Sequence, residues 1–132
     1  MNEETKKQKI LIVDDDRFLL DMYSLKFTES GFDVHAAFGS VEAMNKLKDG
    51  LSPDAILLDI VMPTMDGFEF LEKRNNERIA PKAKVIILSN LGQQSDIDRG
   101  KTLGAVGYIV KASATPSEVV KQVVDILGQS SN

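Results

Sequence analysis

Short, continuous apolar runs alternate along this chain with segments whose apolar residues recur at helical spacing. A run of four or five aliphatic residues between turn signals is typical of a strand that is buried on both faces. Strands separated by helices pair in parallel, because each helix returns the chain to the same edge of the sheet. The alternation therefore predicts an α/β fold. The expected strands are 10–13, 33–37, 55–58, 85–88 and 106–110.

The segments between these runs predict five helices. The first three have apolar residues three or four positions apart: Phe18, Leu19, Met22 and Leu25; Val41, Met44 and Leu47; Phe68 and Leu71. The segment between Gly92 and Gly104 is mostly polar, so we expect its helix to be weakly anchored.

The last helix has the clearest local signals. Thr115 is a capping residue, Pro116 suits the first helical position and Glu118 completes a capping box. One face of this helix is expected to be apolar: Val120, Val123, Val124 and Leu127.

Right-handed crossovers then favour a flavodoxin-like (βα)5 three-layer sandwich, with a five-stranded parallel sheet of order 2-1-3-4-5. In this order the first and third strands are neighbours where the winding reverses, and ligands bind at the carboxyl ends of the strands there. The acids Asp14–Asp16 and Asp59 follow these two strands. We expect them to meet at that crevice.

The length, net charge and composition of the chain limit the class of protein to which it can belong. Its 132 residues suit one domain at 9–127, with a flexible lead-in at 1–8 and a tail at 128–132. The net charge is −4 without a basic stripe, which argues against nucleic-acid binding. We expect no membrane partner, because no apolar stretch is long enough to span a bilayer and the N-terminus is not signal-like. The absence of cysteine excludes thiolate sites, and the expected location is cytoplasmic.

Four expected strand ends bear polar groups that suit phosphoryl transfer. Clustered carboxylates attract Mg²⁺, which prefers hard oxygen ligands and would neutralise phosphate charge. A carboxylate can then act as the nucleophile, while an ammonium and a hydroxyl hold the other phosphoryl oxygens. The residues are Asp14 and Asp15, Asp59, Ser89 and Lys111.

From about Lys9 to about Leu127, the chain resembles response-regulator receiver domains, the CheY-like family of two-component signalling. The resemblance rests on four motifs in order. They are Val13–Asp16, Leu58–Gly67, Leu88–Asn90 and Gly104–Lys111.

The resemblance implies a signalling switch rather than an enzyme. Asp59 would accept a phosphoryl group from a phosphohistidine on a sensor histidine kinase or a phosphotransfer protein. Mg²⁺ would be the cofactor, held by Asp59, by Asp15 directly, by Asp14 mainly through water and by the Val61 carbonyl.

The remaining family roles concern the response to phosphorylation. Lys111 would pair with the phosphoryl group, Ser89 would move to hydrogen-bond it, and the Tyr108 ring would turn inward. A downstream protein would read the face made by the fourth helix, the fifth strand and the fifth helix. The chain would be a monomer or a weak, phosphorylation-dependent dimer.

A departure from the family pattern and two apolar positions that flank the phosphoryl group lead to further predictions. Ala112 stands where proline usually follows the lysine, so the Lys111–Ala112 bond is expected to be trans, because a cis bond there costs about 2.5–4 kcal/mol. Val61 and Leu91 are apolar where polar residues could place an attacking water, so slow self-dephosphorylation is expected.

Several residues also have ordinary structural interpretations. Asp16 and Asp66 suit helix caps, and the single histidine, His35, suits a half-buried edge strand. One alternative function is a haloacid-dehalogenase-like phosphohydrolase, with Asp14 as nucleophile and Asp16 as acid. Another is a receiver-shaped interaction module that works without phosphorylation. The sequence leaves open whether the domain acts alone or belongs to a longer chain.

Overall fold

The computed structural model describes residues 7–128, and five parallel strands form a single sheet in this part of the chain. The strand order is β2-β1-β3-β4-β5, which confirms the predicted topology. The strands are β1 (Lys9–Asp14), β2 (Asp33–Phe38), β3 (Ala55–Leu58), β4 (Lys84–Ser89) and β5 (Ala105–Val110).

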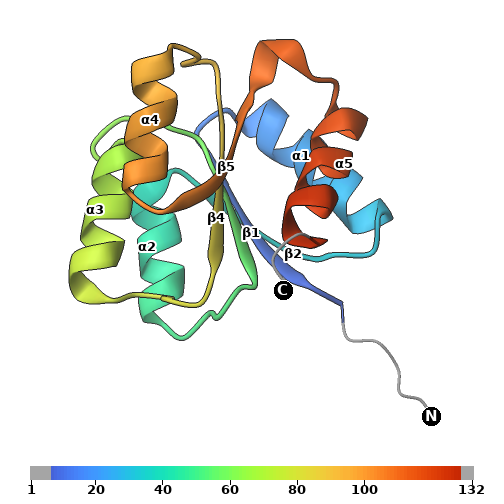
Figure 1. Cartoon of the computed structure of the whole chain (residues 1–132). Helices are drawn as coiled ribbons and strands as arrows, with labels where there is room; N and C mark the ends of the chain where they lie inside the picture. Colours follow the sequence, from blue (N-terminus) through green and yellow to red (C-terminus); the bar gives the residue numbers. More distant parts are fainter. Residues whose placement is uncertain (1–6, 129–132) are drawn as a thin grey trace.

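Helices cover both faces of the sheet (Figure 1), with α1 and α5 on one face and α2, α3 and α4 on the other. They are α1 (Arg17–Glu29), α2 (Ser40–Lys48), α3 (Gly67–Glu77), α4 (Gln94–Thr102) and α5 (Pro116–Gly128), with a 3₁₀ turn η1 (Lys111–Ser113) before α5. The expected lead-in and tail lie mostly outside the described residues, and α5 includes Gly128.

Alternation along the strands divides the core into two layers. In β1, Leu11 and Val13 are buried on the side of α2 and α3, whereas Ile10 and Ile12 are buried on the side of α1 and α5. All four side chains are at most 1% exposed, so the central strand is buried on both faces. This burial holds the strand ends in fixed positions.

The apolar residues that predicted α1 divide between its two faces, and only Leu19 and Met22 pack against the core. Phe18 and Leu25 are 73% and 58% exposed, and the residues that pack inward are Leu20, Tyr23 and Phe27. Two apolar stripes run along this helix, and helical periodicity alone does not decide which of them meets the sheet. The inward stripe places Tyr23 beside a hollow that Lys111 also lines.

In α5 the buried face is rotated slightly from the predicted apolar face. Val124 is 48% exposed, whereas Val119 is fully buried beside Val120 and Val123. The buried face is centred near Val123, and Val124 lies 100° further round the helix. The capping box predicted for this helix is present, since the Glu118 N–H donates to Thr115 Oγ1 and the Thr115 N–H donates to Glu118 Oε1.

Helix α4 is weakly anchored, as predicted. Gly100 is its only buried residue, and Ile97 is half-buried. His35 is a half-buried residue of the edge strand β2, which also agrees with the sequence analysis. Within residues 7–128, none of the helices has the length and apolar character needed to span a membrane.

Candidate functional site

Three carboxylates converge at the carboxyl edge of the sheet. Asp14 is the last residue of β1, Asp15 follows it, and Asp59 follows β3. Parallel pairing of β1 with β3 puts Val13 beside Leu58, and the Asp59 N–H donates to the Val13 carbonyl at 3.1 Å. One oxygen from each acid lies within 4.8 Å of the others. The structure therefore brings together the acids that the strand pattern placed at this crevice.

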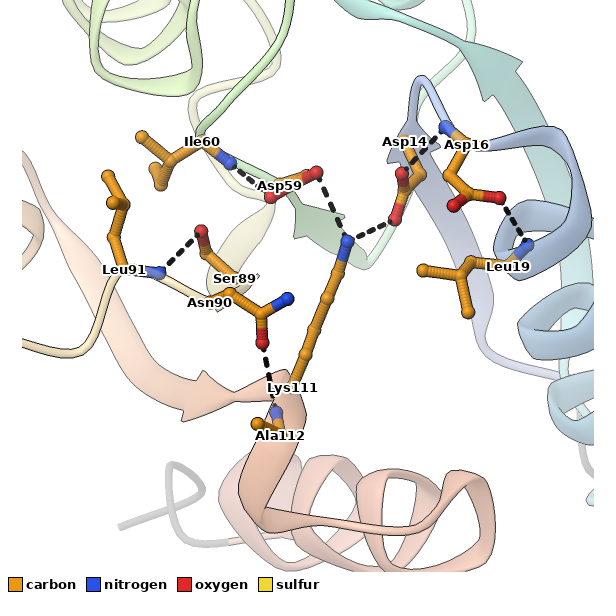
Figure 2. A network of polar contacts seen from close by, with 10 residues as sticks. All are labelled: Asp14, Asp16, Leu19, Asp59, Ile60, Ser89, Asn90, Leu91, Lys111 and Ala112. Atoms are coloured by element: carbon orange, nitrogen blue, oxygen red, sulfur yellow. Dashed lines mark hydrogen bonds and ion pairs between the residues drawn. The ribbon is translucent and has the colours of Figure 1, made fainter.

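Lys111 lies between two of these acids (Figure 2). Its Nζ is 2.9 Å from Asp14 Oδ2 and 3.1 Å from Asp59 Oδ2. The side chain of Lys111 is 10% exposed, and those of Asp14 and Asp59 are 3% and 7% exposed. These ion pairs are therefore shielded from solvent, in contrast to the exposed pairs on the helices.

The charges at this edge do not balance. Three carboxylates against one ammonium leave a net formal charge of −2. Oxygen ligands with excess negative charge suit a hard divalent cation such as Mg²⁺. The donor set of Asp14, Asp15 and Asp59 therefore fits the metal expected from the sequence.

Burial and charge oppose one another at Asp59. Burial raises the pKa of Asp59 above its ordinary value of 3.8, and the neighbouring Asp14 carboxylate raises it further, while Lys111 opposes both. Burial lowers the pKa of Lys111, but the Asp14 and Asp59 carboxylates outweigh burial, so this pKa is raised overall. The two carboxylates thus favour the charged form of Lys111, whereas an additional positive charge nearby would favour the ionised form of Asp59.

The loop after β3 orients the Asp59 carboxylate. Its Oδ1 accepts the Ile60 N–H at 2.7 Å, which leaves Oδ2 directed at Lys111. The loop closes where the Gly67 N–H donates to the Ile60 carbonyl at 2.8 Å. A Cβ on Gly67 would collide with the Asp59 carbonyl oxygen, so this close approach requires glycine.

Asp66 then starts α3 with the predicted cap. It forms a capping box with Glu69. The buried Ser40, at the start of α2, donates a hydrogen bond to the Met65 carbonyl in the same loop. Asp59 therefore stands on a loop that is fastened at both ends.

Ser89 and Tyr108 border the site from β4 and β5. Ser89 is fully buried at the last position of β4, and its Oγ accepts the Leu91 N–H at 3.3 Å. The half-buried Tyr108 donates its hydroxyl hydrogen to the Leu91 carbonyl. Both predicted switch residues thus contact the loop between β4 and α4.

The Lys111–Ala112 peptide bond is trans, as predicted, because the described residues contain no cis bond. A single 3₁₀ turn accommodates the backbone there.

Val61 is the least defined of the predicted metal ligands. It lies two residues beyond Asp59, and the residue is 60% exposed at the lip of the site. The role of its carbonyl as a metal ligand stays a prediction.

Asp16 has the structural role that its position suggested. Its carboxylate accepts the Leu19 N–H at 3.1 Å and caps α1, while its own N–H donates to Asp14 Oδ1 at 2.9 Å. A phosphohydrolase would need Asp16 as an acid beside an Asp14 nucleophile. Asp14 is instead paired with Lys111, so the geometry does not favour that alternative.

Comparison with known proteins decides the family. The model of the response regulator receiver domain matches residues 10–124 of this chain. The chain belongs to this family. Its setting is two-component signalling, in which receiver domains work with histidine kinases and downstream effectors. The phosphohydrolase alternative is therefore wrong.

Relatives and solved structures agree with this assignment. The chain is 36% identical over 115 residues to the chemotaxis protein CheY of Thermotoga maritima, covering 86% of this chain and 92% of that protein. It is 33% identical to the DNA-binding regulator RpaA of Synechocystis, covering 78% of this chain but only 42% of the regulator.

Among solved structures, a CheY-like receiver domain protein from Methanospirillum hungatei superposes with a TM-score of 0.82 at 28% identity. The match covers 94% of this chain and 96% of that one. CheY4 of Vibrio cholerae gives a TM-score of 0.83 at 27% identity, covering 92% and 99%.

Two residues near the site have no role in the sequence analysis. Asn90 belongs to the motif after β4, and its Oδ1 accepts the Ala112 N–H at 3.0 Å. Tyr23 is buried beside a hollow of about 310 Å³ that Lys111 also lines, and burial raises the pKa of its phenol. A signal for Asn90 was available, because an alanine after Lys111 has an N–H that proline lacks. The position of Tyr23 depended on the facing of α1, which periodicity did not determine.

Proposed function

We propose that this chain is a phosphorylation switch in which Asp59 accepts a phosphoryl group in a Mg²⁺-dependent reaction. The observation that carries the proposal is the pairing of a nearly buried Asp59 with Lys111, 3.1 Å away, inside a cluster of acids. A buried carboxylate with a raised pKa and a neighbouring carboxylate is poorly compensated, and a divalent cation would compensate it.

The chemical step is a displacement at phosphorus. A carboxylate oxygen of Asp59 forms a bond to phosphorus as the P–N bond of a donor phosphohistidine breaks, and the bonding electrons leave with the imidazole nitrogen. Lys111 pairs with a phosphoryl oxygen, and the Ser89 hydroxyl donates a hydrogen bond to another. Mg²⁺, held by Asp14, Asp15, Asp59 and the Val61 carbonyl, would neutralise charge on the transferred group.

The response is proposed to pass through the loop between β4 and α4. Movement of Ser89 toward a phosphoryl group breaks the 3.3 Å contact of its Oγ with the Leu91 N–H. Because the Tyr108 hydroxyl donates a hydrogen bond to the Leu91 carbonyl, the same movement also affects the position of Tyr108 in β5. Because α4 has one buried residue, its position is readily biased, and the face of α4, β5 and α5 is the surface we propose for a downstream protein.

The lifetime of the phosphorylated state is proposed to be long. Val61 and Leu91 line a common hollow of about 400 Å³ beside Asp66 and Phe68. Neither side chain has a group that could orient a water molecule for attack on the acyl phosphate, and both can shield it.

The test is Mg²⁺-dependent incorporation of phosphate from acetyl phosphate, followed by mapping of the modified residue. We expect labelling at Asp59, its loss in Asp59→Asn and its retention in Asp16→Ala, which removes only a helix cap. Absence of labelling, together with failure to bind Mg²⁺ or beryllofluoride, would instead support an interaction module that works without phosphorylation.

A further inference from the structure

One hydrogen bond links the two loops that border Lys111. The Ala112 N–H donates to Asn90 Oδ1 at 3.0 Å, across 22 positions of the sequence (Figure 2). Asn90 directly follows Ser89, the last residue of β4, and Ala112 directly follows Lys111, the first residue after β5. The contact therefore joins the segments that supply the hydroxyl and the ammonium of the site.

The turn that holds Lys111 has few other fastenings. The three residues of η1 include no buried residue, and no side chain caps the start of the turn. Ala112 and Ser113 are exposed, so apolar packing contributes little to the position of the main chain there. The ammonium of Lys111 nevertheless has to reach two carboxylates at 2.9 and 3.1 Å. A directional contact to the adjacent peptide supplies the missing constraint.

The loop after β4 is a suitable anchor for that contact. Its next residue, Leu91, is held at the carbonyl by Tyr108 and at the N–H by Ser89. Asn90 thus projects from a segment that is fixed on either side. Its short amide side chain has little conformational entropy to lose when it accepts a hydrogen bond.

We propose that Asn90 is a positioning residue for phosphoryl transfer, because it holds the Ala112 peptide and so aims Lys111 at Asp59 before the donor arrives. The role deepens the proposed function and rests on it. Groups that stabilise developing charge act most strongly when they are already in place. Proline at position 112 would remove the N–H that Asn90 binds, so the arrangement depends on a residue other than proline there.

The test uses two variants of similar size. Asn90→Leu lacks the acceptor, and Asn90→Asp keeps it. The first measurement is amide hydrogen exchange at Ala112 by NMR. The second is the rate of Mg²⁺-dependent labelling of Asp59 over a range of acetyl phosphate concentrations. The third is the Mg²⁺ concentration that half-saturates the site, which reports whether the three acids are still in place.

For Asn90→Leu, we expect Ala112 exchange to be about three- to tenfold faster and labelling at saturating donor to be slower by a similar factor, since one neutral hydrogen bond is lost. The Mg²⁺ half-saturation should change less than about twofold, because none of the three acids is touched. Asn90→Asp should restore both rates. If the leucine does not fit, Asn90→Ala repeats the test without added bulk.

The outcomes separate the two proposals. Labelling of Asn90→Leu at the parent rate, or equal slowing in Asn90→Asp, would overturn the positioning role alone. Slower labelling with unchanged Ala112 exchange would overturn it too. A parent chain that takes up no phosphate would reject the proposed function and the positioning role with it.

Discussion

Replacing Lys111 with methionine should destabilise the metal-free protein, whereas replacing Asp59 with asparagine should not. Within residues 7–128, Lys111 is the only cation within 4.0 Å of Asp14 or Asp59. Lys111→Met leaves both buried carboxylates without a cationic partner, although each keeps one backbone N–H donor. Asp59→Asn leaves the pair between Lys111 and Asp14 at 2.9 Å and removes a charge. The two substitutions, although they affect one ion-pair network, are thus expected to change the stability of the metal-free protein in different directions.

Breaking a buried ion pair by removing one partner costs about 3–5 kcal/mol. The carboxylates lie at the edge of the sheet and Asp15 is half-buried, so we take the lower limit, about 3 kcal/mol. At an unfolding entropy of roughly 2.1 cal/mol/K per residue, a chain of 132 residues has about 0.28 kcal/mol/K. The midpoint of thermal unfolding should therefore fall by roughly 10 °C.

The pH dependence of Asp59→Asn follows from the raised pKa of Asp59. The folded state binds the Asp59 proton more tightly than the unfolded state does, so this residue favours folding below pH 3.8, and the contribution is lost as the pH rises through the folded pKa. Asparagine has no proton to lose. The stability of Asp59→Asn relative to the parent should therefore increase between pH 4 and pH 7.

The assay is thermal unfolding followed by circular dichroism, with EDTA or with Mg²⁺. Mg²⁺ should raise the midpoint of Lys111→Met more than that of the parent, because the ion then replaces the lost cation and no longer competes with it. Lys101→Met is a matched control, since that lysine is exposed on α4. A metal-free Lys111→Met midpoint within about 2 °C of the parent, roughly one fifth of the expected shift, would refute this prediction. An equal fall in the midpoint of Asp59→Asn would refute it too.

Three further predictions concern the loops around the site. Gly67→Ala should lower the free energy of unfolding by about 2–3 kcal/mol in chemical denaturation, because its Cβ meets fixed backbone. The control is Gly107→Ala, whose Cβ meets only the end of a side chain at 2.6 Å, and it should lower the free energy of unfolding by less than half as much. Equal losses in the two variants would contradict this. Asp66→Ala should cost about 1 kcal/mol through loss of the capping box, with restoration by Asp66→Ser as the check. Val61→Glu with Leu91→Asn should speed loss of phosphate from the labelled protein severalfold, and an unchanged half-life would reject shielding as the cause of slow hydrolysis.

The order of the strands could be predicted from the sequence because most of the strands are mainly apolar runs, and right-handed crossovers between them favour the observed order. For β3 the predicted range, 55–58, equals the observed one. The acids could be placed for the same reason, since the carboxyl ends of β1 and β3 are fixed once the topology is known. Asp14 and Ser89 proved to be the final residues of their strands. That shift of one position leaves both side chains at the same edge.

The facing of helices was less predictable. In α1, the stripe with Phe18 and Leu25 is as apolar as the buried stripe with Leu20 and Phe27, so the choice depends on packing against the sheet. The contact of Asn90 with Ala112 also depends on tertiary structure, because its partners come from different loops. Local patterns therefore located the groups at the strand ends, and long-range contacts determined how the groups are held.

The irregular pairing of β5 with β4 bears on how copies of this domain can meet. Val85 pairs with Ala105 and Ile86 with Gly107, so Val106 is an extra residue in an edge strand, and it is 53% exposed. Such a bulge interrupts the regular row of free N–H and C=O groups that an incoming strand would need. The outer side of β5 is thus a poor template for sheet extension. The exposed valine can take part in side-chain contacts at this edge without inviting the backbone pairing that leads to aggregation.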